Sequence, residues 1–188
     1  AASYVAAARQ LSARRGDAAR ALDARVTSLM QDLGMRGGVF ETRIVTAEPP
    51  QLAEHGADDT ECLVSANPGQ PERPLRKVAS GGELSRISLA IEVAALGQDA
   101  VPTMVFDEVD AGIGGAVAEV VGRKLRTLGR ARQVLCVTHL PQVAAQADGH
   151  VAVSKSSAGE STRIRIEPLD RERRREEIAR MLGGVEIT

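Results

Sequence analysis

Two short, uniformly apolar segments, each followed at once by polar residues, constrain the fold of this chain most strongly. One covers residues 101–106 and runs into an Asp-Glu pair, and the other covers residues 134–137 and runs into Thr-His. Helical patterns precede, separate and follow them. Apolar strands that alternate with helices are typical of a parallel sheet with helices on both faces. We therefore predict an α/β fold with a mostly parallel sheet.

The flanking segments predict further elements. Residues 1–33 carry apolar side chains at three- and four-residue steps, which predicts one long helix, either the end of a coiled-coil arm or an ordinary packed helix. The segment 67–77 holds three prolines and a glycine and is expected to be a loop. We expect strands at 38–46 and 61–66, a hairpin formed by 150–155 and 162–167, and helices at 80–96, 115–128 and 170–182.

Composition excludes several classes of protein. Hydrophobic residues make up 43% of the chain but aromatic residues only 2%, so the core is expected to consist of Ala, Val, Leu and Ile. A net charge of −1 provides no overall basic field for nucleic acid or membrane. No apolar run of membrane-spanning length and no signal peptide are visible in this sequence, and the two cysteines suggest a reducing cytoplasm. The three histidines and two cysteines lack metal-ligand spacing, so zinc is not expected.

The polar residues that follow the apolar strands are the first candidates for a site, because ligands of parallel sheets bind beyond the carboxyl ends of the strands. Asp107 could hold hydrated Mg²⁺, and Glu108 could orient or deprotonate a water molecule. Adjacent strand residues point to opposite faces, so the two would have different tasks. The alternatives are a solvated acidic turn for this pair and a purely structural histidine for His139.

A second candidate is the segment Ser80-Gly81-Gly82-Glu83 at the start of a predicted helix. Ser followed three residues later by Glu is a capping box. Two glycines in a first helical turn are unfavourable for the helix, but they let another backbone or a phosphate come close. The exposed N–H groups of a helix start also attract anions. The sequence is consistent with a helix cap and with a phosphate site at this segment, and the two are compatible.

Taken together, these segments resemble a known family. VASGGELSRISLAIEV, FDEVDAGIGG and QVLCVTHLPQVAAQAD follow one another as signature loop, Walker B strand, D-loop and switch histidine do in ABC-type ATPases. Over about residues 75–155 the sequence closely resembles the RecN family of bacterial DNA-repair proteins, which are SMC-like ATPases. The C-terminal segment EEIARMLGG resembles that family too. The signature departs from that of transporters, which usually have Leu before the Ser and Gln at the end.

The resemblance implies an organisation and a role for each matching residue. Residues 1–33 would end a coiled-coil arm, and 34–188 would form the C-terminal half of an ATPase head. Its signature loop would be 79–83, its Walker B segment 103–108 and its D-loop 109–115. Asp107 would support Mg²⁺, Glu108 would activate water, and His139 would contact the γ-phosphate of ATP. Contact with a nucleotide held by a second head would come from Ser80, Gly81, Gly82 and Asp110.

The sequence contains no G-x-x-x-x-G-K-[ST] motif, so the phosphate-holding P-loop must come from elsewhere. The resemblance places it in an N-terminal half, and we expect this chain alone to be inactive. The implied partners are that half, a second head and DNA double-strand ends, in a cytoplasmic, nucleoid-associated protein. The alternatives are the head of another SMC or Rad50-like protein, or a non-catalytic interaction module of the same fold.

The charged run 171–177 has two interpretations. Its arginines could contact DNA phosphates. Acidic residues are interleaved with them, which favours a solvated helix face with pairs of opposite charge.

Overall fold

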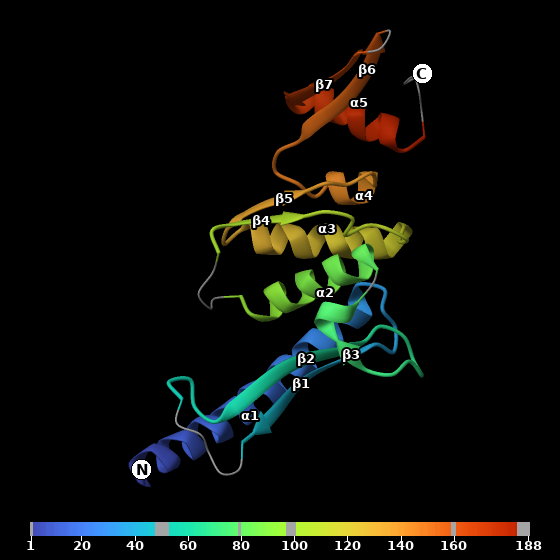
Figure 1. The fold of residues 1–188 in the computed structure, drawn as a ribbon. Helices are drawn as coiled ribbons and strands as arrows, with labels where there is room; N and C mark the ends of the chain where they lie inside the picture. The colour runs from blue at the N-terminus through green and yellow to red at the C-terminus, as the bar shows by residue number, and fades with distance from the viewer. Residues whose placement is uncertain (1, 48–52, 79, 97–100, 159–160, 184–188) are drawn as a thin grey trace. The chain divides into compact units, whose positions relative to one another are not determined.

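The computed structural model describes residues 2–47, 53–78, 80–96, 101–158 and 161–183, with the backbone alone at 156–158 and 161–162. The chain divides into two compact units, residues 1–100 and 101–188 (Figure 1). Ala79, which belongs to the predicted signature loop, lies outside the described residues.

The first unit is a helix packed on an antiparallel hairpin. Its elements are α1 (Ala2–Asp32), β1 (Val39–Thr46), β2 (Asp58–Ser65), β3 (Arg73–Pro74), the 3-10 helix η1 (Leu75–Lys77) and α2 (Gly81–Ala94). β1 and β2 pair from Val39 opposite Ser65 to Thr46 opposite Asp58. Helix α1 contacts both β1 and α2. The largest buried side chains of this unit are Val26, Met30, Leu33, Phe40, Leu63, Ile87 and Leu89.

Most predicted elements of this unit are confirmed, with two corrections. β2 begins at Asp58, three residues earlier than predicted, because pairing with β1 extends it into the polar segment. The loop prediction for 67–77 was wrong at its end, where β3 pairs with β2 and η1 follows. A two-residue strand has no periodicity of its own, so only its pairing partner defines it.

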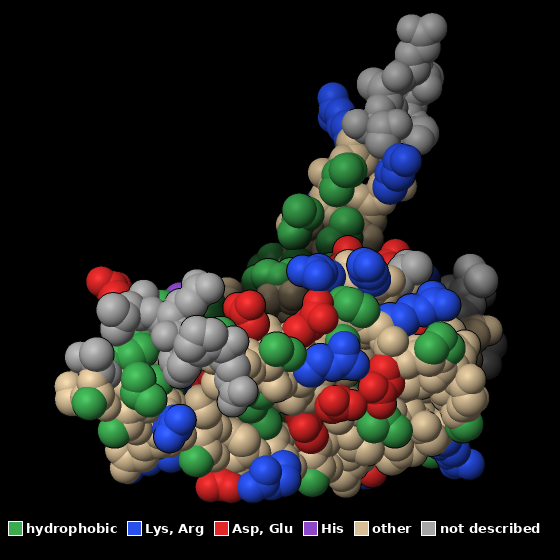
Figure 2. All heavy atoms as spheres, turned by 60° about the horizontal axis from the view of Figure 1, so that its bottom comes forward, with side chains coloured by type: hydrophobic (Ala, Val, Ile, Leu, Met, Phe, Trp, Pro, Cys, Tyr) green, Lys and Arg blue, Asp and Glu red, His purple; other side chains and the backbone are tan. Residues whose placement is uncertain are grey.

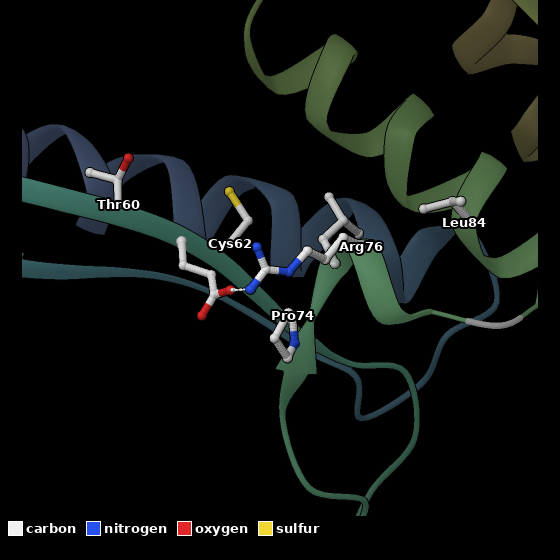
Figure 3. A pocket seen from close by; sticks show the side chains of 7 residues that line it. Thr60, Cys62, Pro74, Arg76 and Leu84 are labelled. Carbon is white, nitrogen blue, oxygen red and sulfur yellow. Dashed lines mark ion pairs between the residues drawn. The ribbon is translucent and has the colours of Figure 1, made fainter.

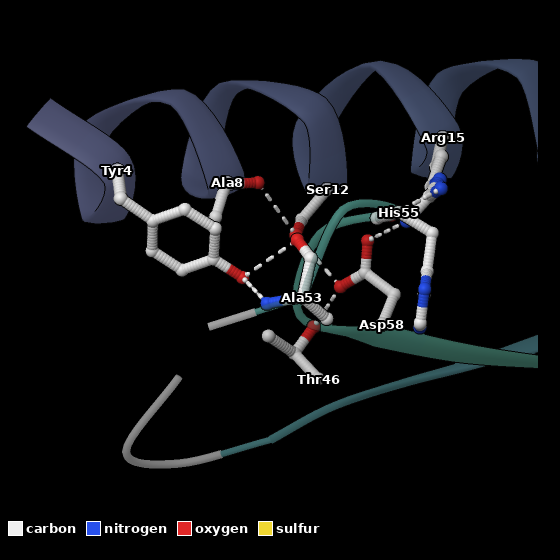
Figure 4. A network of polar contacts seen from close by, with 8 residues as sticks. All are labelled: Tyr4, Ala8, Ser12, Arg15, Thr46, Ala53, His55 and Asp58. Atoms are coloured by element: carbon white, nitrogen blue, oxygen red, sulfur yellow. Dashed lines mark hydrogen bonds and ion pairs between the residues drawn. The ribbon is translucent and has the colours of Figure 1, made fainter. Parts of the chain in front are cut away.

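Buried polar contacts hold α1 on the hairpin where β1 ends and β2 begins (Figure 4). The Asp58 carboxylate, whose side chain is fully buried, accepts hydrogen bonds from Ser12 Oγ at 2.7 Å and Thr46 Oγ1 at 2.8 Å. Arg15 forms an ion pair with it at 3.0 Å and also donates to the His55 carbonyl. Just before β1 begins, Gly38 is required, because a Cβ there would lie 2.9 Å from the carbonyl oxygens of Ser65 and Ala66 at the end of β2.

The second unit contains the predicted parallel strands. Its elements are β4 (Thr103–Phe106), α3 (Gly115–Gly129), β5 (Gln133–Cys136), α4 (Pro141–Ala144), β6 (Val151–Ala158), β7 (Ser161–Pro168) and α5 (Arg171–Met181). β4 and β5 are parallel and in register from Thr103 opposite Gln133 to Phe106 opposite Cys136. β6 and β7 form the predicted antiparallel hairpin, whose tip at 159–160 lies outside the described residues.

Helix α3 covers one face of the parallel pair (Figure 1). Its apolar residues recur at helical spacing, and Ala118, Val121, Leu125 and Leu128 are buried. The opposite face of the pair carries Val105, Leu135 and Val137, which are 65%, 51% and 62% exposed. The α/β class is confirmed. Within the described residues, however, parallel pairing is limited to β4 and β5, and no helix of the second unit covers their second face.

Candidate functional site

The parallel pairing of β4 and β5 brings the predicted polar residues to one edge of the sheet. Both strands end at this edge, and the Val137 N–H donates to the Phe106 carbonyl at 2.9 Å. Asp107 and Glu108 therefore follow the end of β4, and His139 follows the end of β5 at the same edge. Asp107, Glu108 and His139 are all exposed, so a ligand beyond this edge could reach them.

Glu108 adopts a backbone conformation that its residue type disfavours. Its φ is +56°, and it is the one residue other than glycine with a positive φ among those described. A side chain with a Cβ costs about 1–2 kcal/mol in the left-handed region, and such residues gather at functional sites. β4 ends at Phe106, so the opposite directions of the two carboxylates cannot be derived from strand alternation. The sharp turn after β4, closed by the Ala111 N–H on the Glu108 carbonyl, sets the direction of Glu108 instead.

Asp110 holds the segment that carries His139. Its side chain is 3% exposed, and its carboxylate accepts hydrogen bonds from the Thr138 hydroxyl and, at 3.1 Å, from the His139 backbone N–H. Nδ1 of His139 lies 3.4 Å from the same carboxylate, while the imidazole is 71% exposed. The backbone of His139 is thus anchored and its ring faces outward.

These contacts add a local task for Asp110 to the predicted one. The sequence suggested a residue that reaches a nucleotide across a head–head interface, and that role stays a prediction. Sequence reasoning missed the anchor and its second partner, Thr138. The order Thr-His after an apolar strand was visible, but nothing local links it to an aspartate 28 residues away.

The carboxylates at this edge also act on the half-buried thiol of Cys136. Burial, followed by the negative charges of Asp110 and Asp107, raises the pKa of Cys136 to about 12. Cys136 therefore stays protonated at neutral pH and is a poor nucleophile. The same field favours a cation beyond the strand ends.

The predicted signature segment begins α2 in the first unit. Ser80 is the N-cap, and its Oγ accepts a hydrogen bond from the Glu83 N–H at 3.4 Å, which confirms this half of the capping box. Ser80 and Gly81 are exposed, whereas Gly82 is buried. Contact of these residues with a phosphate stays a prediction.

A hollow of about 420 Å³ lies beside α2, between its first turn and the β2–β3 pair (Figure 3). Arg76 and Glu61 form an ion pair of 2.9 Å among its lining residues. Cys62 also lines the hollow, and burial is the main cause that raises the pKa of its thiol. None of the predicted site residues lines it. The full lining is Thr60, Glu61, Cys62, Pro74, Leu75, Arg76 and Leu84.

Within the described residues, no group of three or more His, Cys, Asp or Glu side chains could hold a metal ion by itself. None of the helices described there is long and apolar enough to cross a membrane. The face drawn in Figure 2 mixes basic, acidic and hydrophobic side chains, without a field of one sign.

No family model matches the sequence, but curated proteins are similar to nearly all of it. The DNA repair protein RecN of Xylella fastidiosa (strain 9a5c) is 58% identical over 182 residues, which is 97% of this chain and 33% of that protein. RecN of Vibrio cholerae serotype O1 is 45% identical over 186 residues, with 99% and 33% covered. RecN of Treponema pallidum (strain Nichols) is 44% identical over 182 residues, with 95% and 32% covered. The chain thus spans about a third of the length of these relatives.

Solved structures of SMC heads share the fold. The SMC head domain with a coiled coil and joint from Pyrococcus yayanosii has a TM-score of 0.60 at 21% identity, covering 86% of this chain and 29% of that one. The SMC head domain of Pyrococcus furiosus bound to the C-terminal domain of ScpA has a TM-score of 0.55 at 20% identity, covering 86% and 38%. By its sequence this chain belongs to the RecN family, and its fold is that of an SMC head domain.

Proposed function

We propose that this chain is half of an SMC-type ATPase head that acts in DNA double-strand-break repair. The observation that carries the proposal is the edge of the β4–β5 pair. There the strained turn at Glu108 follows one strand, and the anchored His139 follows the other. Energy stored in a disfavoured backbone is expected where a side chain must be aimed. The RecN relatives, which are named as DNA repair proteins, support the cellular role.

The residues at this edge fit Mg²⁺ and ATP. Mg²⁺ prefers oxygen ligands, keeps several waters and is usually held by one or two carboxylates together with substrate phosphates. Asp107 would hold the ion, which would neutralise charge on the phosphate oxygens. Glu108 would orient the attacking water and accept its proton, and His139 would donate a hydrogen bond to the γ-phosphate.

The proposed head needs residues that this chain does not supply. Val105, Leu135 and Val137 leave an apolar sheet face open to solvent, as expected where another part of a protein normally covers it. We assign that place to the N-terminal half with its P-loop. Ser80, Gly81, Gly82 and Asp110 would then serve a nucleotide held by a second head. One structural neighbour is described by ATP-driven dimerisation and DNA-stimulated activation of SMC ATPases, which supports such a pairing.

ATP turnover of the chain with and without a separately produced P-loop half tests the proposal. We expect no turnover from the chain alone. The mixture should hydrolyse ATP, with a rate that rises faster than linearly with protein concentration, because two heads must meet. Robust turnover by the chain alone, or none in the mixture at any concentration, would contradict a split head that works as a dimer.

Glu108→Gln in the mixture separates catalysis from mere binding. The amide keeps the size of the side chain but cannot accept the proton. We expect turnover to fall by about 100-fold or more, the usual contribution of a general base, while ATP binding persists. Unchanged turnover would remove Glu108 from its role and favour the non-catalytic interaction module.

A further inference from the structure

We propose that Arg174 of α5 is a positioning residue for His139, acting through the short helix α4. The inference rests on the proposed function of His139 and extends it to the C-terminal helix. Its basis is a set of contacts between α5 and the segment that follows β5.

One guanidinium group binds four backbone carbonyls. Nη2 of Arg174 donates to the carbonyls of Ala144 and Ala145, each at 3.2 Å, and to that of Ala147. Nη1 donates to the carbonyl of Asp148 at 3.4 Å. Arginine suits this place because its planar fork offers five donors and its positive charge is favourable at the carbonyl end of a helix. A side chain on a solvated helix face would not be expected to bind four backbone carbonyls.

Helix α4 needs support from outside. It has only four residues, Pro141–Ala144, and a helix that short is not stable by itself. On one side it lies so close to α3 that a Cβ at Gly122 would be 2.7 Å from Cγ of Gln146 and 3.2 Å from the Gln142 carbonyl. Arg174 holds its end on the α5 side.

The position of α4 is coupled to that of His139 by the chain itself. Leu140 is the N-cap of α4 and directly follows His139. The Leu140 N–H donates to the Thr138 hydroxyl at 3.1 Å, and this hydroxyl donates to Asp110. The segment 138–148 is therefore held at its start by Asp110 and at its end by Arg174. A loose end would let α4 shift and would move the imidazole from its place.

The sequence contained no signal for this contact. Arg174 stands within the charged run 171–177, where its direct neighbours Arg173 and Arg175 are exposed. Arg173, for example, pairs with Glu167 of β7 at 3.3 Å. The interpretation of the run as a solvated helix face therefore holds for its exposed members but misses Arg174, whose direction depends on where α5 meets α4.

The test compares Arg174→Ala with Arg173→Ala in the complete protein, in which this chain is joined by its P-loop half. Both variants lose one positive charge from α5, but only the first frees the carbonyls at the end of α4 and just after it. In Arg174→Ala we expect kcat for ATP hydrolysis to fall about 10- to 100-fold, as for a misplaced reacting group, with KM for ATP little changed. Backbone amides of 138–148 should exchange hydrogen for deuterium faster in this variant. Arg173→Ala should resemble the wild type in both measurements.

Arg174→Lys serves as a second variant if the alanine variant does not fold. An ammonium group donates from one point and cannot span the carbonyls, so kcat and exchange should lie between wild type and alanine. Unchanged exchange of 138–148 in both Arg174 variants would overturn the clamp. Faster exchange with unchanged kcat would overturn the positioning role.

The failure of the proposed function is a separate result. If the wild-type complete protein does not hydrolyse ATP, the role of His139 fails, whatever the Arg174 variants show. The exchange measurement then still decides whether Arg174 holds the segment 138–148.

Discussion

Glu108 is the residue whose conformation and chemistry are most closely linked. A carboxylate shortly after an apolar strand could lie on an ordinary extended backbone and point along the strand. Here the backbone turns at once into the left-handed region at +56°, and the turn is closed three residues later. The side chain is thereby fixed in direction at a cost in stability. Such a cost is tolerated where the direction itself is needed.

This strain can be measured by replacing Glu108 and, as a control, Glu119 with Gly and with Ala. At Glu108, Gly should be more stable than Ala by roughly 1 kcal/mol, because Gly carries no Cβ penalty at positive φ. At Glu119, an exposed residue of α3, the order should be reversed by a similar amount, since Gly is the weaker helix former. Urea unfolding of the four variants measures both differences. The same order at both positions would show that Glu108 is not held in the left-handed region.

At the scale of elements, the Asp58 carboxylate joins three segments that the sequence keeps far apart. Ser12 and Arg15 come from α1, Thr46 ends β1, and Asp58 begins β2. Hydrogen bonds from Ser12 and then Arg15 are the largest causes that lower the pKa of Asp58 below its ordinary value of 3.8. The ionised carboxylate is thus the form that holds the helix on the hairpin.

This link makes the packing of α1 dependent on pH. Because the pKa of Asp58 is lower in the folded chain than in the unfolded chain, its contribution is fully present above the ordinary value and is lost as pH falls through the folded value. Asp58→Asn should therefore melt at a lower temperature than the wild type at pH 7, and the difference should shrink below pH 3.8.

Asp17→Asn is the matched control for this pH dependence. Asp17 also lies on α1 and pairs with Arg20, but both side chains are about three-quarters exposed, so their pair contributes little. A melting temperature of Asp58→Asn that follows the wild type at every pH would contradict the role of the buried carboxylate.

At the scale of the whole molecule, the open face of the β4–β5 pair is the dominant feature. Three large aliphatic side chains lie there in adjoining positions, because Val105 pairs with Leu135 and Val137 follows two residues later on the same face. The opposite face is covered by α3. A parallel sheet is normally buried on both faces, so the described part of this unit supplies half of the cover that the sheet requires.

Val105→Lys should separate the stability of the chain from its assembly. The side chain is 65% exposed, so the free energy of unfolding of this chain alone should change little. Binding to the P-loop half should weaken at least about tenfold, since a buried unpaired charge costs well over 1.4 kcal/mol. Val45→Lys is the control, because Val45 is 57% exposed on β1, a strand of the other unit and of another sheet. Equal effects of the two variants in a binding titration would exclude the open sheet face as the assembly surface.

Much of the fold was predictable because its signals are local. Apolar spacing identified α1, the capping pair identified the start of α2, and the uniform strands identified β4 and β5. β3 was missed because two residues in a proline-rich segment become a strand only through their pairing with Val64 and Leu63. The open second face of the parallel pair was also missed. A sequence of apolar residues shows that a strand should be buried, but not whether the chain supplies the cover.

The candidate site, too, has features that the sequence predicts and features that depend on the tertiary structure. By itself, the sequence determined which residues follow each strand and therefore that Asp107, Glu108 and His139 share an edge, since parallel strands end together. Only the tertiary structure decided how they are held: the turn at Glu108, the Asp110 anchor and the Arg174 contacts with α4. The physical reason is range. Periodicity and capping act within a few residues, whereas the Asp110 and Arg174 contacts join residues about 30 positions apart, whose meeting depends on the packing of whole elements.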